Sequence, residues 1–198
     1  MKKQLLREFQ ELRCNERGCV DLLDEHEKSL RQQGVCIFPA KLQEAEARNG
    51  NGRIYPRRVL EREVQKYQQL IENGRAAGTL NHEDSEDIDM GNISHYIKRL
   101  WWSDNDVIGI VQCASTPKGQ ILKNLYDDGL VFGFSSRALG SLKESRDGSI
   151  VQEDLELICF DAVYTPSAPT AYVMRESLGS KKEKISQLFE SILTRKKI

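Results

Sequence analysis

Residues 131–139 read Val131-Phe132-Gly133-Phe134-Ser135-Ser136-Arg137-Ala138-Leu139. This short apolar run breaks into a pair of serines and an arginine, and it predicts a strand. Side chains alternate between the two faces of a strand, so even and odd positions separate. Phe132 and Phe134 make the even positions the better core face, and Ser136 is expected to point inward with them. Ser135 and Arg137 then lie on the opposite, less crowded face.

Ser135 is the better candidate nucleophile of the two serines, because it shares its face with Gly133, whose missing side chain leaves room for a substrate. Arg137, on the same face, would stabilise an oxyanion directly or through water, or would position its loop. Ser136 is the second candidate nucleophile, and otherwise an oxyanion-binding or substrate-positioning residue. The alternative is that both serines simply end a strand. The run is not the nucleophile elbow of α/β-hydrolases, because Arg137 stands where the second glycine belongs.

A histidine and an acid elsewhere in the chain could complete a hydrolytic site. His82 lies in a polar loop, whereas Asp161 lies in an apolar strand pattern, where a carboxylate is costly unless it is paired. A serine, a histidine that acts as general base and an orienting acid are the parts of a nucleophilic hydrolase. Asp89 remains an alternative orienting acid. The alternatives are that His82 is an ordinary surface histidine among acidic residues, and that Asp161 is a structural acid bonded to a turn or an arginine.

A metal site is a weaker hypothesis. His82, His95 and Asp89 would be its ligands, but they lack any recognised zinc spacing. His95 shares a strand face with Ile93 and Ile97, which is typical of a half-buried structural histidine. We therefore expect no metal and no cofactor, and sensitivity to chelators would distinguish a metal-dependent hydrolase from a serine enzyme.

The composition is that of an ordinary globular protein of 198 residues, with 39% hydrophobic and 30% charged residues. A formal net charge of -1 gives no argument for binding to nucleic acid or to an anionic membrane. No apolar run approaches the roughly 18 residues that span a bilayer, and the polar N-terminus is not a signal peptide. The five cysteines form no Cys-x-x-Cys pair, which favours reduced thiols in a cytosolic compartment.

The pattern of elements predicts an α+β or mainly-β domain. Apolar and alternating runs indicate strands over 35–38, 42–47, 93–102, 107–113, 131–139 and 155–164. Proline at the first helical position predicts helices that begin near Pro56 and Pro117. No regular βαβ alternation and no glycine-rich phosphate loop appears, so a doubly wound sheet is not expected.

Three regions are expected along the chain. Residues 1–34 would form a helical N-terminal appendage or pro-segment of two short amphipathic helices, the first carrying Leu5, Leu6, Phe9 and Leu12. Residues 35–175 would form the main domain. Residues 176–198 would form a basic amphipathic tail helix with an apolar face of Ile185, Leu188, Phe189 and Ile192.

Five segments in order carry a family resemblance over about residues 40–175. They are Asn49-Gly50-Asn51-Gly52-Arg53-Ile54-Tyr55-Pro56, Leu80-Asn81-His82, Leu100-Trp101-Trp102, Gly133-Phe134-Ser135-Ser136-Arg137-Ala138-Leu139-Gly140-Ser141, and Phe160-Asp161-Ala162-Val163 with Pro166-Ser167-Ala168-Pro169. This series resembles the prohead core scaffold and maturation proteases of T-even-type tailed bacteriophages. The chain departs from the family pattern at Glu83, where a proline is common, and at Ala138, where a glycine is common.

The resemblance implies a serine endopeptidase with a mainly antiparallel, β-barrel-like core and flanking helices, similar to the herpesvirus capsid assembly proteases. By matching motifs, His82 would be the catalytic histidine and Ser135 the nucleophile. The role of Asp161 follows from its strand position, and Asp89 stays open beside it. Ala138 would alter the backbone geometry beside the oxyanion site.

The resemblance also implies partners and a location. The substrates would be phage scaffold or core proteins and the major capsid protein, processed in the host cytoplasm inside the immature capsid. Self-cleavage would follow Glu190 in the tail, because such enzymes often cut after a glutamate that has an aliphatic residue two positions before it. A homo-oligomer is compatible with these properties, whereas a membrane or a specific nucleic acid is not expected. The alternative function is that of a catalytically inert scaffold or core protein of the prohead.

Overall fold

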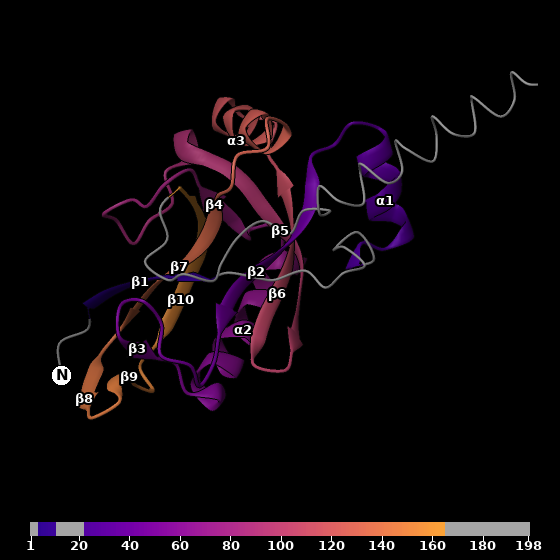
Figure 1. The fold of residues 1–198 in the computed structure, drawn as a ribbon. Coiled ribbons are helices and arrows are strands. Elements are labelled where there is room, and N and C mark those ends of the chain that lie inside the picture. Colours follow the sequence, from indigo (N-terminus) through magenta and orange to yellow (C-terminus); the bar gives the residue numbers. More distant parts are fainter. Residues whose placement is uncertain (1–3, 11–21, 165–198) are drawn as a thin grey trace, which may run out of the picture.

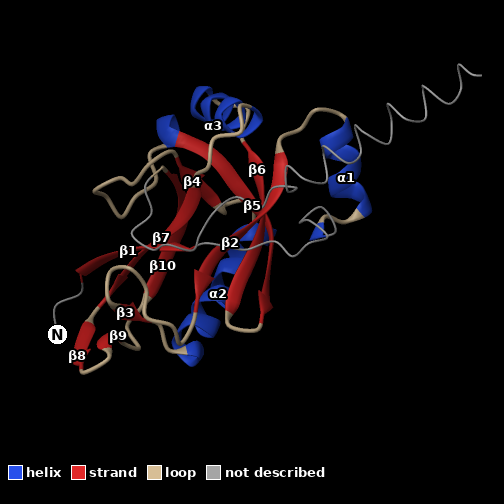
Figure 2. Ribbon diagram, viewed as in Figure 1, coloured by secondary structure: helices blue, strands red, loops and turns tan. Residues whose placement is uncertain are grey.

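The structure is a computed structural model that describes residues 4–10 and 22–164. Figure 2 shows a core of strands with helices at its periphery. The elements are β1 (Gln4–Gln10), α1 (Glu25–Gln32), β2 (Ile37–Glu44), β3 (Arg53–Ile54), α2 (Arg57–Glu72), β4 (Ala77–Thr79), η2 (Met90–Asn92), β5 (Ile93–Ser103), β6 (Asp106–Cys113), α3 (Pro117–Asp127), β7 (Gly133–Gly140), β8 (Leu142–Ser145), β9 (Gly148–Val151) and β10 (Glu156–Val163).

The described strands form three sheets. Their orders are β1-β7-β10, β2-β6-β5-β4 and β3-β9-β8. Neighbouring strands are antiparallel except β3 and β9, which pair in parallel. A single bridge between Leu80 and Ala162 joins the first two sheets just beyond β4. The predicted α+β class is confirmed, but across the described residues these sheets do not close into a barrel.

The helices lie against or beside the sheets (Figure 1), with α3 at the top of the view and α1 at the upper right. The helix predicted from Pro56 is confirmed as α2, and its apolar stripe is buried as expected, including Leu60, Val64 and Tyr67. The Tyr67 ring packs edge-on against Phe160 of β10, with ring centroids 5.1 Å apart. This contact couples α2 to the strand that carries Asp161. The helix predicted from Pro117 is also confirmed as α3, with Thr116 as its N-cap.

The first predicted helix of the N-terminal region is wrong over residues 4–10, which form strand β1. This strand pairs antiparallel with β7 along its whole length. The backbone pairing available at the edge of β7 overrides a helical spacing that rested on few apolar residues. The second predicted helix exists as α1, which begins with a capping box between Asp24 and Glu27.

Two strands predicted separately, over 35–38 and 42–47, form the single strand β2. Pro39 lies inside it, and this is compatible with pairing because β2 is an edge strand of its sheet. The short strands β3, β4, β8 and β9 were not predicted, since their residues are too few or too polar to give an alternating pattern. The predicted tail helix over 176–198 lies outside the described residues. The division of the chain at residues 34 and 175 stays a prediction.

The sheet β1-β7-β10 brings the candidate residues together. β7 and β10 are antiparallel, and Ser135 lies directly opposite Asp161 in their register. Directly opposed residues of an antiparallel pair present their side chains on the same face, so both side chains lie side by side. β4 ends at Thr79, beside the bridge to β10, and leads into the loop that carries His82.

Candidate active site

Ser135, His82 and Asp161 form one chain of hydrogen bonds. The Oγ atom of Ser135 lies 2.8 Å from Nε2 of His82. The Nδ1 atom of His82 lies 2.9 Å from Oδ2 of Asp161. Ser135 and Asp161 are buried, at 1% and 0% exposure, whereas the His82 side chain is 22% exposed. The histidine is therefore the member of this chain that faces the surroundings.

The ionisation of Asp161 decides the tautomer of His82. Burial alone would raise the pKa of Asp161, but the hydrogen bond from His82, the charge of Arg137 and the bonds from Thr79 lower this pKa to about 2. An ionised carboxylate accepts hydrogen bonds only, so Nδ1 of His82 must carry the proton. In the neutral imidazole, Nε2 is then free to accept the hydroxyl proton of Ser135. This is the arrangement that general-base activation of a serine requires.

The carboxylate of Asp161 is held by several further donors. Its Oδ1 atom accepts hydrogen bonds from the amide and the hydroxyl of Thr79, at 3.1 and 2.8 Å. The thiol of Cys159 donates to the same oxygen at 3.2 Å, and burial raises the pKa of this thiol, which keeps it protonated. Nη2 of Arg137 donates to Oδ1 at 3.2 Å. All of these donors bind Oδ1, which leaves Oδ2 to face Nδ1 of His82.

A tight turn places His82 beside the acid. Asn81 has a positive φ of 68°, a conformation that asparagine tolerates better than most residues. The backbone amide of Asn81 donates to the backbone carbonyl of Ala162 at 2.7 Å. This bond clamps the chain immediately before His82 to the residue immediately after Asp161. The distance between imidazole and carboxylate therefore depends on backbone contacts and not only on side-chain packing.

Arg137 is fully buried, and its guanidinium binds the acid and the loop that follows His82. Nη1 donates to the carbonyl of Ser85 at 2.7 Å and to that of Asp87 at 3.4 Å. Nε lies 3.0 Å from Oδ2 of Asp161 as an ion pair, although the angle is unsuitable for a hydrogen bond. Nη1 also lies 3.5 Å from a carboxylate oxygen of Glu83. These contacts favour the loop-positioning alternative for Arg137 over direct binding of an oxyanion.

The other candidate residues lie elsewhere. Ser136 points inward, where its Oγ accepts a hydrogen bond from Gln43 at 2.7 Å. Asp89 is exposed and caps η2, accepting a hydrogen bond from the amide of Gly91 at 2.9 Å. Both side chains thus form these hydrogen bonds with partners other than His82. Among the described residues, no group of His, Cys, Asp and Glu is arranged to hold a metal ion.

Comparison with known proteins agrees with this geometry. Residues 22–183 match the family described as prohead core protein serine protease. The chain belongs to this family. It is 34% identical over 161 residues to the prohead core protein protease of Enterobacteria phage T4, covering 78% of this chain and 76% of that protein. Its fold is similar to the solved structure of the bacteriophage T4 capsid assembly protease, with a TM-score of 0.68, 28% identity, and coverage of 84% of this chain and 100% of that one.

As a prohead core protein serine protease, the chain is an enzyme, and the expectation of an inert core protein is set aside. Two of the residues that hold the acid, Thr79 and Cys159, were not found from the sequence. Thr79 and Cys159 each lie directly before one of the family motifs, but a short strand end and an apolar run gave no sign of their bonds to Asp161. Glu83 departs from the family pattern, and it pairs with Arg137 and accepts a hydrogen bond from Asn92 at 2.7 Å. This departure is compatible with an ordered loop after His82.

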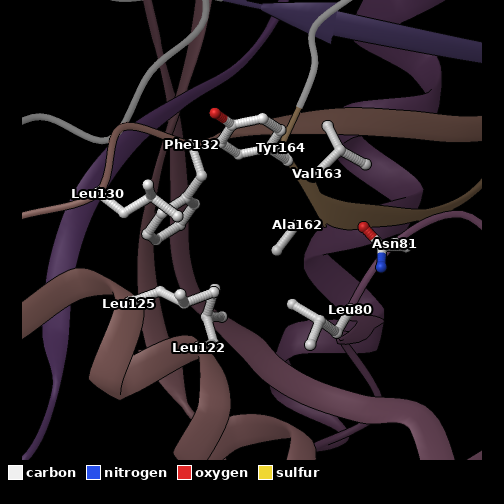
Figure 3. A pocket seen from close by; sticks show the side chains of 9 residues that line it. All are labelled: Leu80, Asn81, Leu122, Leu125, Leu130, Phe132, Ala162, Val163 and Tyr164. Atoms are coloured by element: carbon white, nitrogen blue, oxygen red, sulfur yellow. The ribbon is translucent and has the colours of Figure 1, made fainter. Parts of the chain in front are cut away.

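A cavity of about 260 Å³ lies close to the site in the protease. Figure 3 shows its largely apolar lining between α3 and the end of β10. The lining residues are Leu80, Asn81, Leu122, Leu125, Leu130, Phe132, Ala162, Val163 and Tyr164. Ala162 follows Asp161 in β10 and so points to the opposite face of that strand. Val163, which also lines the cavity, points to the same face as Asp161, so the cavity lies around the end of β10. Ser135, His82 and Asp161 are not among its lining residues.

His95 of the protease is structural in its contacts. Its Nε2 donates to the carbonyl of Phe160 at 2.9 Å, and its Nδ1 accepts from the hydroxyl of Ser94 at 2.9 Å. The imidazole packs edge-on against Phe134, with ring centroids 5.1 Å apart. His95 thus joins β5 to the residues directly before Ser135 and Asp161. Burial lowers the pKa of His95 from 6.5 to about 4, against the opposing influence of Asp161.

We expect the stability of the protease to fall as the pH decreases from 6.5 to 4. In this interval the unfolded chain binds a proton at His95 that the folded chain does not, so stability rises with pH. The lowered pKa corresponds to about 3 kcal/mol across the interval. Urea unfolding at several pH values measures it. His95→Gln, which keeps a donor and an acceptor but does not titrate, is the control: equal slopes for both proteins would contradict the prediction.

Proposed function

We propose that this enzyme cleaves scaffold or core proteins and the major capsid protein inside the immature phage capsid, in the host cytoplasm. The family membership and the T4 relatives support this assignment of substrates and location. We further propose a fold similar to that of the herpesvirus capsid assembly proteases, on the strength of the resemblance in the five motifs. The proposal includes a homo-oligomer, and it includes neither a membrane nor a specific nucleic acid as a partner. None of the helices that the structure describes combines the length and the apolar character that a membrane span requires.

In the proposed mechanism Ser135 is the nucleophile, His82 the general base and Asp161 the orienting acid. His82 takes the hydroxyl proton as Ser135 attacks the scissile carbonyl, and it then gives this proton to the leaving amine. Asp161 keeps the proton on Nδ1 and stabilises the imidazolium that forms. The observation that carries the proposal is the continuous chain of hydrogen bonds, 2.8 Å from Ser135 to His82 and 2.9 Å from His82 to Asp161.

The proposal assigns two further roles. Arg137 positions Asp161 and the loop after His82, and Ser136 supports the nucleophile strand from the core through its bond to Gln43. Cleavage after Glu190 in the tail remains a proposal that lies outside the described residues.

A fluorophosphonate reagent tests the site directly, because it phosphonylates only an activated serine. We expect one covalent adduct, located on Ser135 by peptide mass spectrometry, in the presence or absence of a chelator. Ser135→Ala should carry no adduct. An adduct on Ser136, or loss of labelling on addition of the chelator, would contradict the assignment. The second result would instead support a metal-dependent hydrolase.

A further inference from the structure

Strand β1 occupies the edge of the strand that carries Ser135. β7 lies in the middle of its sheet, with β10 on one side and β1 on the other. The register of β1 runs from Gln4, opposite Gly140, to Gln10, opposite Phe134. Phe9 lies directly opposite Ser135. The N-terminal segment of the chain therefore passes the nucleophile in an extended, antiparallel conformation.

This is the placement that a protease substrate needs. An extended peptide binds to an exposed sheet edge by adding a strand, and main-chain hydrogen bonds hold it there. Without β1, the edge of β7 would present unpaired amides and carbonyls beside Ser135. The other edge of β7 pairs with β10 and carries the acid, so it is not available. A substrate that uses the edge of β7 must take the place that β1 holds.

Two observations separate β1 from the catalytic fold. The family match begins at residue 22, after β1, whereas β7 and β10 lie within it. In addition, Ser135 is only 1% exposed in this arrangement, so a substrate reaches it only after neighbouring chain has moved. β1 thus lies before the matched family region, and it is paired with the strand that carries the nucleophile.

We propose that β1 is a built-in substrate strand, which excludes other substrates from β7 until the enzyme cuts it beside Phe9. The inference rests on the proposed function. Ser135 Oγ attacks the carbonyl carbon of Glu8 or Phe9, and His82 takes its proton. The peptide C–N bond breaks, and the nitrogen receives that proton. Water then hydrolyses the acyl-enzyme, which leaves a free carboxylate on the released peptide and a new amino terminus at Phe9 or Gln10.

The first test is the N-terminus of the full chain after purification and incubation. Intact mass and N-terminal sequencing should find a new terminus at Phe9 or Gln10 in the wild type, and Met1 or Lys2 in Ser135→Ala. Because the strand is paired within its own chain, the fraction cut per unit time should not change when the protein is diluted. A wild type that reacts with the fluorophosphonate but keeps its N-terminus would overturn the inference.

The second test measures occupancy of the edge without cleavage. In the Ser135→Ala background, Leu6→Pro/Arg7→Pro removes two successive main-chain donors, one of which faces β7 in either register. Leu6→Ala/Arg7→Ala is the matched control. A synthetic peptide of residues 2–13 should bind the proline variant more tightly than the alanine variant. The ratio of the two dissociation constants equals the reciprocal of the fraction of the alanine variant in which β1 has left the edge of β7. This ratio is about tenfold if β1 has left β7 in one molecule in ten.

Equal affinity of the two variants for the peptide would also overturn the inference. Labelling of Ser135 by the fluorophosphonate distinguishes a failure of this inference from a failure of the proposed function. If the fluorophosphonate labels neither the wild type nor the chain with Leu6→Pro/Arg7→Pro, Ser135 is not an activated nucleophile, and both proposals fall together.

Discussion

Ser135→Ala is expected to lower the rate constant kcat for proteolysis by about 10⁶-fold, because it removes the group that forms the acyl-enzyme. The assay incubates each protein with the scaffold or major capsid protein of its own phage and follows the fragments by intact mass. The Ser135 hydroxyl donates to His82, and its small size makes its loss compatible with an intact fold. Residual cleavage would reflect only substrate binding and the oxyanion site.

The neighbouring serine is the matched control for this prediction. Ser136→Ala removes a hydroxyl that faces the core and accepts a hydrogen bond from Gln43. It should cost about 1–3 kcal/mol in the free energy of unfolding, because the amide of Gln43 loses a buried partner. Its kcat should stay far above that of Ser135→Ala. If Ser135→Ala cleaved at the wild-type rate, or if a folded Ser136→Ala were inactive, the roles of the two serines would be exchanged.

The alternation of side chains along β7 is sufficient to predict from the sequence which face carries the candidate site residues. The expectation that this face is less crowded is wrong, because Ser135 and Arg137 are 1% and 0% exposed. Phe132 and Phe134 identify the core side of the strand, and this parity separates Ser135 from the inward-pointing Ser136. The same argument from burial singles out Asp161, because a carboxylate in an apolar strand needs a partner. Alternation is a local property, so it can be predicted wherever a strand has one apolar face.

The contacts that orient Asp161 were not predictable in this way. Thr79, Cys159 and Arg137 reach the carboxylate from three places in the chain, and their meeting depends on the pairing of β4, β7 and β10. Strand β1 was mispredicted for the same reason. Its residues carry a spacing compatible with a helix, and only the free edge of β7 makes an extended conformation the better one. Long-range pairing is not encoded in the periodicity of either segment.

Asp161→Asn is expected to lower kcat by about 10⁴-fold, as loss of the orienting acid does in serine proteases. An amide has one acceptor and one donor, whereas both oxygens of Asp161 accept hydrogen bonds in this structure. If the new NH2 group pointed toward His82, it would force the imidazole proton onto Nε2, which could then no longer accept from Ser135. If the amide were reversed, its NH2 group would face the donors of Thr79 and Arg137. In either orientation, the amide cannot make all the hydrogen bonds that the carboxylate accepts.

The same substitution should also destabilise the protein, because Arg137 is fully buried and would lose the charge beside it. Removing one partner of a buried ion pair costs about 3–5 kcal/mol in the free energy of unfolding, measurable by urea denaturation. The kinetic assay must therefore be run where the variant is folded. Asp89→Asn is the matched control, since that exposed carboxylate caps η2 and should leave kcat within about tenfold of wild type. If Asp89→Asn were the more damaging change, the acid that supports His82 would be Asp89, and the buried carboxylate would serve only to hold Arg137 and the strands together.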